Sequence, residues 1–223
     1  MEIFLDTANI EEINEILTWG IMRGLTTNQK IFLNEKGVNF EQQVKKILAL
    51  VDGPVSIEAP ACNVEGIISS ARTYAKWNKR KVVIKVPMLT NGDGLKAAHI
   101  LENEGIKTNV TAMMTVNQAM LATTAGASYA SLFFNRIKDY GADAVDIVRR
   151  SRAFIDQGGY KTKLIVGSIR SPMDITDIAF ANPHIVTIPY KILKQMPFHE
   201  KTEETLKEFD KAWEEFLKAE KKC

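Results

Sequence analysis

The sequence predicts an α/β protein whose eight parallel strands close into a single-domain (β/α)8 barrel. Eight short β-branched or apolar runs alternate with segments of helical spacing along the 223 residues, which is typical of a parallel sheet. Each strand–helix unit takes about 28 residues, and barrels of roughly 200–250 residues form single domains. An open doubly wound sheet is the alternative. No glycine-rich dinucleotide fingerprint supports it, because the first run leads into Asp6-Thr7-Ala8-Asn9.

The expected elements alternate along the chain. Short apolar runs predict strands at residues 2–6, 22–26, 54–58, 82–86, 106–111, 127–133, 163–168 and 184–188. Apolar residues that recur every three or four positions predict helices at residues 10–17, 39–51, 63–77, 94–104, 115–125, 142–157 and 172–181. No repeat, linker or low-complexity stretch divides the chain, so residues 1–198 are expected to form one catalytic barrel.

The C-terminal segment, residues 199–223, differs from the rest of the chain. Over residues 199–222 it is highly charged and predicts a long amphipathic helix. Its apolar stripe consists of Leu206, Phe209, Trp213, Phe216 and Leu217. The periodicity favours packing of this helix on its own barrel. The alternative is that the aromatic stripe docks on a neighbouring subunit.

Composition excludes several classes of protein. The 29 basic and 27 acidic residues leave a net charge of +2, which excludes nucleic-acid binding driven by net charge. No basic-then-apolar leader and no run of about 18 apolar residues is present, so we expect neither secretion nor a membrane span. Cys62 and Cys223 give no disulfide framework and no metal-ligand spacing. We therefore expect a cytoplasmic protein without a metal site.

Polar residues gather at the carboxyl ends of the expected strands, where barrel enzymes place their reactive groups. They are Asp6, Thr26, Thr27, Asn28, Glu58, Lys85, Asn109, Thr111, Ser131, Arg136, Ser168 and Arg170. Some also have a structural interpretation. Asp6 and Thr7 could signal the start of a helix near Asn9, Asn28 could be a turn residue, and Ser168 could cap the following helix.

Lys85 is the most informative of these residues. Period-two alternation places Val83, Lys85 and Pro87 on one face of the strand, and the opposite, wholly apolar face suits the surrounding helices. Lys85 then points into the barrel, where loss of water favours the neutral amine that attacks a carbonyl. The alternative is a lysine whose stem packs while its ammonium reaches water.

Basic residues supply a second constraint. Arg136 follows the sixth strand, and Ser168 and Arg170 follow the seventh, which is where barrels commonly bind phosphate. Arginine matches phosphate with a bidentate fork, although a solvated surface position is the common fate of a single arginine. Together with an inward lysine and inward carboxylates, these residues predict an enzyme that makes or breaks carbon–carbon bonds in a sugar phosphate.

At these positions the chain resembles the small transaldolase family, which includes short transaldolases and fructose 6-phosphate aldolases. The resemblance covers essentially the whole chain. It is carried by residues 3–8 (IFLDTA), 24–28 (GLTTN), 83–87 (VIKVP), 105–111 (GIKTNVT), 125–129 (AGASY), 135–137 (NRI) and 168–170 (SIR).

The resemblance implies a transaldolase of the pentose phosphate pathway that needs no cofactor. Lys85 would form a Schiff base with the ketose, Asp6 would be the acid and base, and Glu58 with Thr111 would hold a water molecule. The expected substrate contacts are Thr26, Asn28, Asn109, Ser131 and Phe133, with Arg136, Ser168 and Arg170 at the phosphate. The family also forms rings of five, often paired into decamers, through a C-terminal helix that packs across subunits. The resemblance therefore implies a homo-oligomer in which residues 199–223 pack on a neighbouring subunit.

Two positions favour transfer over release of free dihydroxyacetone. The aldolase branch has glutamine in place of Glu58 and tyrosine in place of Phe133, and a phenylalanine cannot donate a proton. Departures from the family pattern lie around the pocket, at Gln29, Leu132, Asn135 (glycine in most transaldolases) and 112–114. A lyase that releases dihydroxyacetone, or an enzyme for a different sugar, is therefore the alternative. A silent sugar-phosphate-binding protein would have no need of Lys85, Asp6 and Glu58.

Overall fold

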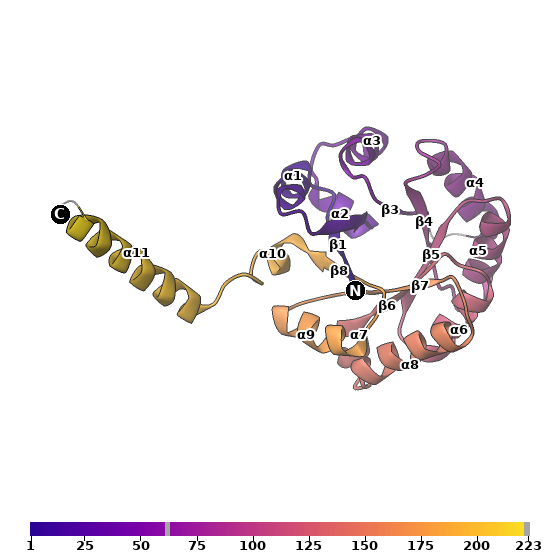
Figure 1. The fold of residues 1–223 in the computed structure, drawn as a ribbon. Helices are drawn as coiled ribbons and strands as arrows, with labels where there is room; N and C mark the ends of the chain where they lie inside the picture. The colour runs from indigo at the N-terminus through magenta and orange to yellow at the C-terminus, as the bar shows by residue number, and fades with distance from the viewer. Residues whose placement is uncertain (61–62, 221–223) are drawn as a thin grey trace.

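A computed structural model gives the fold of the chain and describes residues 1–60 and 63–220. Eight parallel strands close into a barrel in the order β1 to β8, with β1 paired to β8, and helices surround it (Figure 1). The strands are β1 (Glu2–Asp6), β2 (Met22–Thr26), β3 (Val55–Glu58), β4 (Val82–Pro87), β5 (Thr108–Met113), β6 (Tyr129–Phe133), β7 (Lys163–Gly167) and β8 (Ile185–Pro189). The predicted (β/α)8 barrel is confirmed.

The helices fall into two groups. Those expected from periodicity are α1 (Ile10–Thr18), α3 (Phe40–Leu50), α4 (Val64–Ala75), α5 (Asp93–Asn103), α6 (Val116–Thr124), α8 (Ala144–Gln157), α9 (Pro172–Ala181) and α11 (Glu200–Glu220). Three short helices were not expected, and they are α2 (Gln29–Asn34), α7 (Phe134–Asp139) and α10 (Tyr190–Leu193). The short helices begin next to the carboxyl ends of β2, β6 and β8, so they surround the mouth of the barrel.

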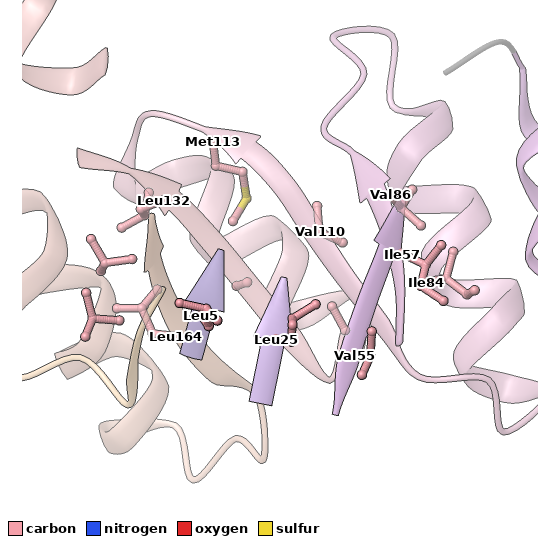
Figure 2. Close-up of a cluster of buried hydrophobic side chains, with 14 of the residues drawn as sticks. Leu5, Leu25, Val55, Ile57, Ile84, Val86, Val110, Met113, Leu132 and Leu164 are labelled. Atoms are coloured by element: carbon pink, nitrogen blue, oxygen red, sulfur yellow. The ribbon is translucent and has the colours of Figure 1, made fainter. Parts of the chain in front are cut away.

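Alternation along the strands separates an outer apolar layer from the barrel interior. In β4, Val82, Ile84 and Val86 belong to the large core between strands and helices, while Val83 does not. Figure 2 shows the same band on the neighbouring strands, from Leu5 to Leu164. Lys85 therefore points inward, as the alternation predicts.

A second, small apolar cluster fills the barrel interior toward the amino-terminal ends of the strands. Phe4, Ile165 and Ile185 pack together there, next to Tyr129. Gly24 makes room for this layer, because a Cβ on Gly24 would lie 2.6 Å from the Phe4 ring. The polar inward residues lie on the carboxyl-terminal side of this layer, one alternation further along each strand.

Helix caps decide which polar residues stay free for the site. Asn9, not Asp6 or Thr7, caps α1, because its side chain accepts from the N–H groups of Glu11 and Glu12. Ser171, not Ser168, caps α9 in a capping box. Asn28 is not a simple turn residue, since its side chain accepts from the N–H of Ile31 and caps α2. The cap interpretations of Asp6 and Ser168 are therefore wrong.

Helix α11 stands apart from the barrel. Figure 1 shows it at the end of an extended segment, away from the other helices, and none of its residues from Glu200 to Glu220 is buried. The expectation that it packs on its own barrel is wrong. Both cysteines, Cys62 and Cys223, lie outside the described residues, as does the end of the predicted helix beyond residue 220. Among the helices described, none is long and apolar enough to cross a membrane.

Candidate active site

A cavity of about 800 Å³ opens at the carboxyl-terminal end of the barrel. Most of the residues predicted for the site line it, and these are Asp6, Thr26, Asn28, Lys85, Asn109, Thr111, Ser131, Phe133, Arg136 and Ser168. They come from strands β1, β2, β4, β5, β6 and β7 and from the segments that follow them. Within the described residues, Glu58 and Arg170 are not part of this lining.

Lys85 is held inside the barrel. Its side chain is 6% exposed, and its Nζ donates a hydrogen bond to the backbone carbonyl of Thr27 at 2.9 Å. Thr27 is fixed in turn, because its hydroxyl donates to the carbonyl of Ser56 at 2.8 Å. Lys85 is therefore not a lysine whose stem packs while its ammonium reaches bulk water. The nitrogen is instead presented to the cavity from a rigid strand, as a nucleophile requires.

The carboxyl group of Asp6 shares the cavity with Lys85. Its Oδ1 accepts a hydrogen bond from the Thr26 hydroxyl at 2.6 Å. Burial raises the pKa of Asp6 above its usual value, while the Lys85 charge and the Thr26 hydrogen bond act in the opposite direction. A raised pKa makes the carboxylate a better proton acceptor, which suits a general acid–base group.

Thr187 extends this hydrogen-bonded group to β8. Its hydroxyl lies 2.5 Å from that of Thr26, and because Thr26 donates to Asp6, Thr187 is the donor to Thr26. Thr187 was not among the site residues predicted from the sequence. Alternation could have found it, since Thr187 lies two residues after the inward Ile185 in a strand that was predicted.

A buried polar network orients Asn109 on the opposite wall. The Ser131 hydroxyl donates to Asn109 Oδ1 at 2.7 Å, and Asn109 Nδ2 donates to Ser56 Oγ at 3.3 Å. Asn109 is buried, so these partners fix the direction in which its amide faces. Ser56 was also missed, although it lies two positions before Glu58 in the predicted third strand.

Thr111 follows Asn109 on the inward face of β5. The residue lines the cavity, and its Oγ1 is buried and makes no hydrogen bond with any residue that the structure describes. The β5–β6 register shifts between Val110 and Met113, and Ala112 has a positive φ of 61°. Met113 is fully buried in the outer core (Figure 2), so it packs between strands and helices.

Glu58 lies beside Lys85 in the sheet. The parallel register pairs Glu58 with Lys85, and Lys85 with Asn109. Register partners project on the same face of a sheet, so Glu58 ends the inward row of β3. It is partly exposed and, within the described residues, it is set back from the cavity lining.

The two arginines predicted for phosphate binding lie differently. Arg136, in α7, lines the cavity, and its guanidinium carbon lies 5.8 Å from the centre of the Phe133 ring. The Arg170 guanidinium is half exposed and pairs with Asp139 through two bonds of 2.7 and 2.5 Å. Arg136 is thus the arginine that the fold presents to the cavity, together with Ser168.

The mouth carries further polar and charged residues that were not predicted from the sequence. Lys30 and Glu35 come from the α2 region, and Tyr190 and Lys191 come from α10. Two of the short helices, α2 and α10, supply these groups, and helices of four to six residues are too short to show a periodicity. At the entrance, Lys30 and Lys191 place positive charge beside the acidic Glu12 and Glu35.

Comparisons with known proteins agree with these observations. The profile of the family described as Transaldolase/Fructose-6-phosphate aldolase matches residues 3–223. A probable transaldolase from Alkaliphilus metalliredigens is 42% identical over 218 residues, which are 98% of this chain and all of the relative. Probable transaldolases from Clostridium acetobutylicum and Caldicellulosiruptor saccharolyticus are each 42% identical, over 96% and 98% of this chain and 98% and 99% of the relatives.

Proposed function

The chain belongs to the transaldolase/fructose-6-phosphate aldolase family, and from that premise we propose that it is a transaldolase acting through a Schiff base on Lys85. It would move a dihydroxyacetone unit from a ketose phosphate to an aldose phosphate. The observation that carries the mechanism is the placement of Lys85 Nζ inside the cavity, where its charge acts on the Asp6 carboxyl group. An amine nucleophile and an acid–base carboxyl group thus face one cavity.

The reaction begins with addition of the neutral Lys85 amine to the ketose carbonyl carbon. The carbinolamine then loses water and becomes a protonated imine. Proton transfers at this stage need a water molecule close to the reacting carbon. The unpartnered hydroxyl of Thr111 supports its part in holding that water, and Glu58, beside Lys85 in register, is proposed as the second partner.

Cleavage and transfer both use Asp6. Its carboxylate takes the proton of the C4 hydroxyl, the C3–C4 bond breaks, and the electron pair moves into the imine to leave an enamine and a free aldehyde. In the transfer step the enamine carbon attacks the acceptor aldehyde, and Asp6 returns its proton to the new hydroxyl. Hydrolysis of the imine releases the product and regenerates Lys85.

Polar and charged groups hold the rest of the substrate. Asn28, Asn109 and Ser131 are proposed to hydrogen-bond the dihydroxyacetone fragment, and Thr26 to act mainly through Asp6. Arg136 and Ser168 are proposed to bind the phosphate. Arg170 would bind phosphate only after leaving Asp139.

The imine is tested by trapping. Protein incubated with fructose 6-phosphate and borohydride should gain a reduced adduct on Lys85, located by peptide mass spectrometry. Lys85→Met is the matched variant, because methionine keeps most of the stem volume without the amine. Absence of an adduct on Lys85, together with turnover by Lys85→Met, would exclude the imine mechanism.

Transfer is separated from lysis by the acceptor. Free dihydroxyacetone is followed with fructose 6-phosphate alone and again with erythrose 4-phosphate added. Phe133 lines the cavity and has no proton to donate, so we expect slow release that the acceptor suppresses in favour of transfer. Fast release that ignores the acceptor would instead identify a lyase.

We also propose that α11 docks on another copy of this chain. Its exposed stripe consists of Leu206, Phe209, Trp213, Phe216 and Leu217, with Trp213 and Phe216 stacked 5.4 Å apart. Light scattering should give a pentamer or decamer, and removal of residues 200–223 should reduce that mass. A monomeric full-length protein would contradict the proposal. The cytoplasmic location expected from the sequence stays a prediction.

A further inference from the structure

Asn135 joins the two segments that present Arg136 and Ser168 to the cavity. From the start of α7, its Nδ2 donates to the backbone carbonyl of Ser168 at 2.9 Å and to Asp174 Oδ2 at 2.7 Å. The backbone N–H of Asn135 donates to the same Ser168 carbonyl at 3.3 Å. A single buried side chain therefore connects α7, the segment after β7 and the first turn of α9.

Asp174 completes this connection beneath the segment that follows β7. It is 4% exposed, and its Oδ2 also accepts from the backbone N–H groups of Arg170 and Ser171 at 2.9 and 3.0 Å. Lys138 Nζ lies 3.1 Å from Oδ1. Burial acts against ionisation, but hydrogen bonds from Asn135, Arg170, Lys138 and Ser171 outweigh it and hold the pKa of Asp174 below its usual value.

The segment held in this way includes a strained backbone position. Ser168 has a φ of 62°, in the left-handed region that a residue with a Cβ seldom adopts. Such a conformation persists only where neighbouring groups enforce it. The two hydrogen bonds on the Ser168 carbonyl fix the plane of the peptide that follows. They therefore help to fix how Ser168 is presented to the cavity that it lines.

We propose that Asn135 and Asp174 are positioning residues that hold Ser168 and Arg136 ready for the phosphate of the substrate. They would thereby set the preference for phosphorylated over unphosphorylated sugars. Asn135 precedes Arg136 directly in α7, so the bond from Asn135 to the Ser168 carbonyl also fixes Ser168 relative to Arg136. The inference rests on the proposed function, because it concerns the phosphate end of that site.

The test compares donors with and without phosphate. For wild type, Asn135→Ala and Asp174→Asn, kcat and KM are measured with fructose 6-phosphate and with fructose, using one acceptor. We expect the KM for fructose 6-phosphate to rise at least about fivefold in both variants, as loss of a positioned hydrogen bond commonly causes. The kcat/KM for fructose should change by less than about twofold, because fructose makes no use of the phosphate site.

A swapped pair separates positioning from mere packing. Asn135→Asp combined with Asp174→Asn keeps a hydrogen bond between the two side chains but places a carboxylate, which cannot donate, against the Ser168 carbonyl. We expect this double variant to discriminate between the two donors as poorly as Asn135→Ala. Full recovery of wild-type discrimination would overturn the proposal.

Thr162→Val is the matched control. Its hydroxyl is buried and donates to the Ala127 carbonyl at 2.7 Å, just before the amino end of β7 and therefore at the opposite end of the barrel. It loses one buried hydrogen bond without touching the site, so its discrimination between donors should match wild type. If Asn135→Ala and Asp174→Asn weaken both donors equally, as a general loss of order would, the proposal is wrong.

A binding measurement separates this inference from the proposed function. Calorimetry with inorganic phosphate uses no turnover, and its Kd should rise at least about fivefold in Asp174→Asn, an isosteric change chosen to preserve the fold. An unchanged Kd would overturn the inference even if the enzyme were active. Lack of imine trapping or transfer in wild type, with phosphate binding still weakened in Asp174→Asn, would instead count against the proposed function alone.

Discussion

Asp6 and Asp174 are two carboxyl groups that the fold withdraws from bulk water with opposite results. Burial opposes ionisation in both, yet the pKa of Asp6 is raised and that of Asp174 is lowered. The difference lies in the number of donors. Asp174 accepts from two side chains and two backbone N–H groups, whereas Thr26 is the donor to Asp6 within the described residues. Burial alone therefore does not tell a reactive carboxyl group from a structural one.

The largest effect expected from this comparison is on turnover by Asp6→Asn. The amide cannot exchange the C4 hydroxyl proton, so kcat should fall by about 10²- to 10⁴-fold, the usual contribution of a general acid–base group. Steady-state kinetics measures the loss. Borohydride trapping on Lys85 should persist, because imine formation does not need Asp6. Turnover close to that of wild type would show that another group moves the proton.

Asp174→Ala should act on stability instead. Removal of the carboxylate leaves the Asn135 amide and two backbone N–H groups without their acceptor, which we expect to cost about 2–4 kcal/mol in the free energy of unfolding. Denaturant titration followed by circular dichroism measures it. A cost near zero would mean that water replaces the carboxylate fully.

The pH dependence of stability should have opposite signs at the two sites. Asp6 has a raised pKa in the fold, so its ionisation penalty is absent below the unfolded value near 3.8, grows as pH rises toward the folded value and is complete above it. Asp174 has a lowered pKa, so its stabilisation is present above the unfolded value and lost as pH falls through the folded value. Relative to wild type, Asp6→Asn should gain melting temperature as pH rises above the unfolded value, and Asp174→Asn should lose it. Differences of equal sign would contradict the comparison.

Thr26→Val removes the hydrogen bond that Thr26 donates to Asp6. Its expected effect, on the pH dependence of kcat, is smaller. The hydrogen bond from Thr26 lowers the pKa of Asp6, so its loss should raise that pKa further. Cleavage needs the carboxylate, and the acidic limb of the pH profile of kcat should therefore move to higher pH. An unshifted limb with a uniformly lower kcat would instead indicate that Thr26 contacts the sugar directly.

Lys138→Met should have the smallest effect. The Lys138 side chain is half exposed beside Asp174, and such pairs contribute no more than about 1 kcal/mol. We expect Lys138→Met to have a slightly lower melting temperature than wild type. Added salt should largely remove this difference, because it screens the ion pair in wild type. A loss as large as that of Asp174→Ala would mean that the ion pair, rather than the neutral donors, holds the carboxylate.

Lys85 was predictable from alternation along its strand, and Asp6 and Asn109 from their places at strand ends, because both signals are local in the sequence. Lys85, Asp6 and Asn109 lie where the period of two places them, and the same rule could have added Ser56 and Thr187. The contact between Asn135 and Asp174 joins residues 39 positions apart, and no local pattern predicts it. The pairing of Arg170 with Asp139 depends likewise on how α7 approaches the segment after β7.

The apolar layer of Phe4, Ile165 and Ile185 has a kinetic consequence. It fills the barrel on the amino-terminal side of the polar residues. Donor and acceptor therefore have to share the cavity entrance at the carboxyl-terminal end. In a transfer reaction the first aldehyde then leaves before the second enters. For the proposed transferase, we therefore expect parallel lines in double-reciprocal plots and inhibition by an excess of either substrate, which would occupy the enzyme form that binds the other.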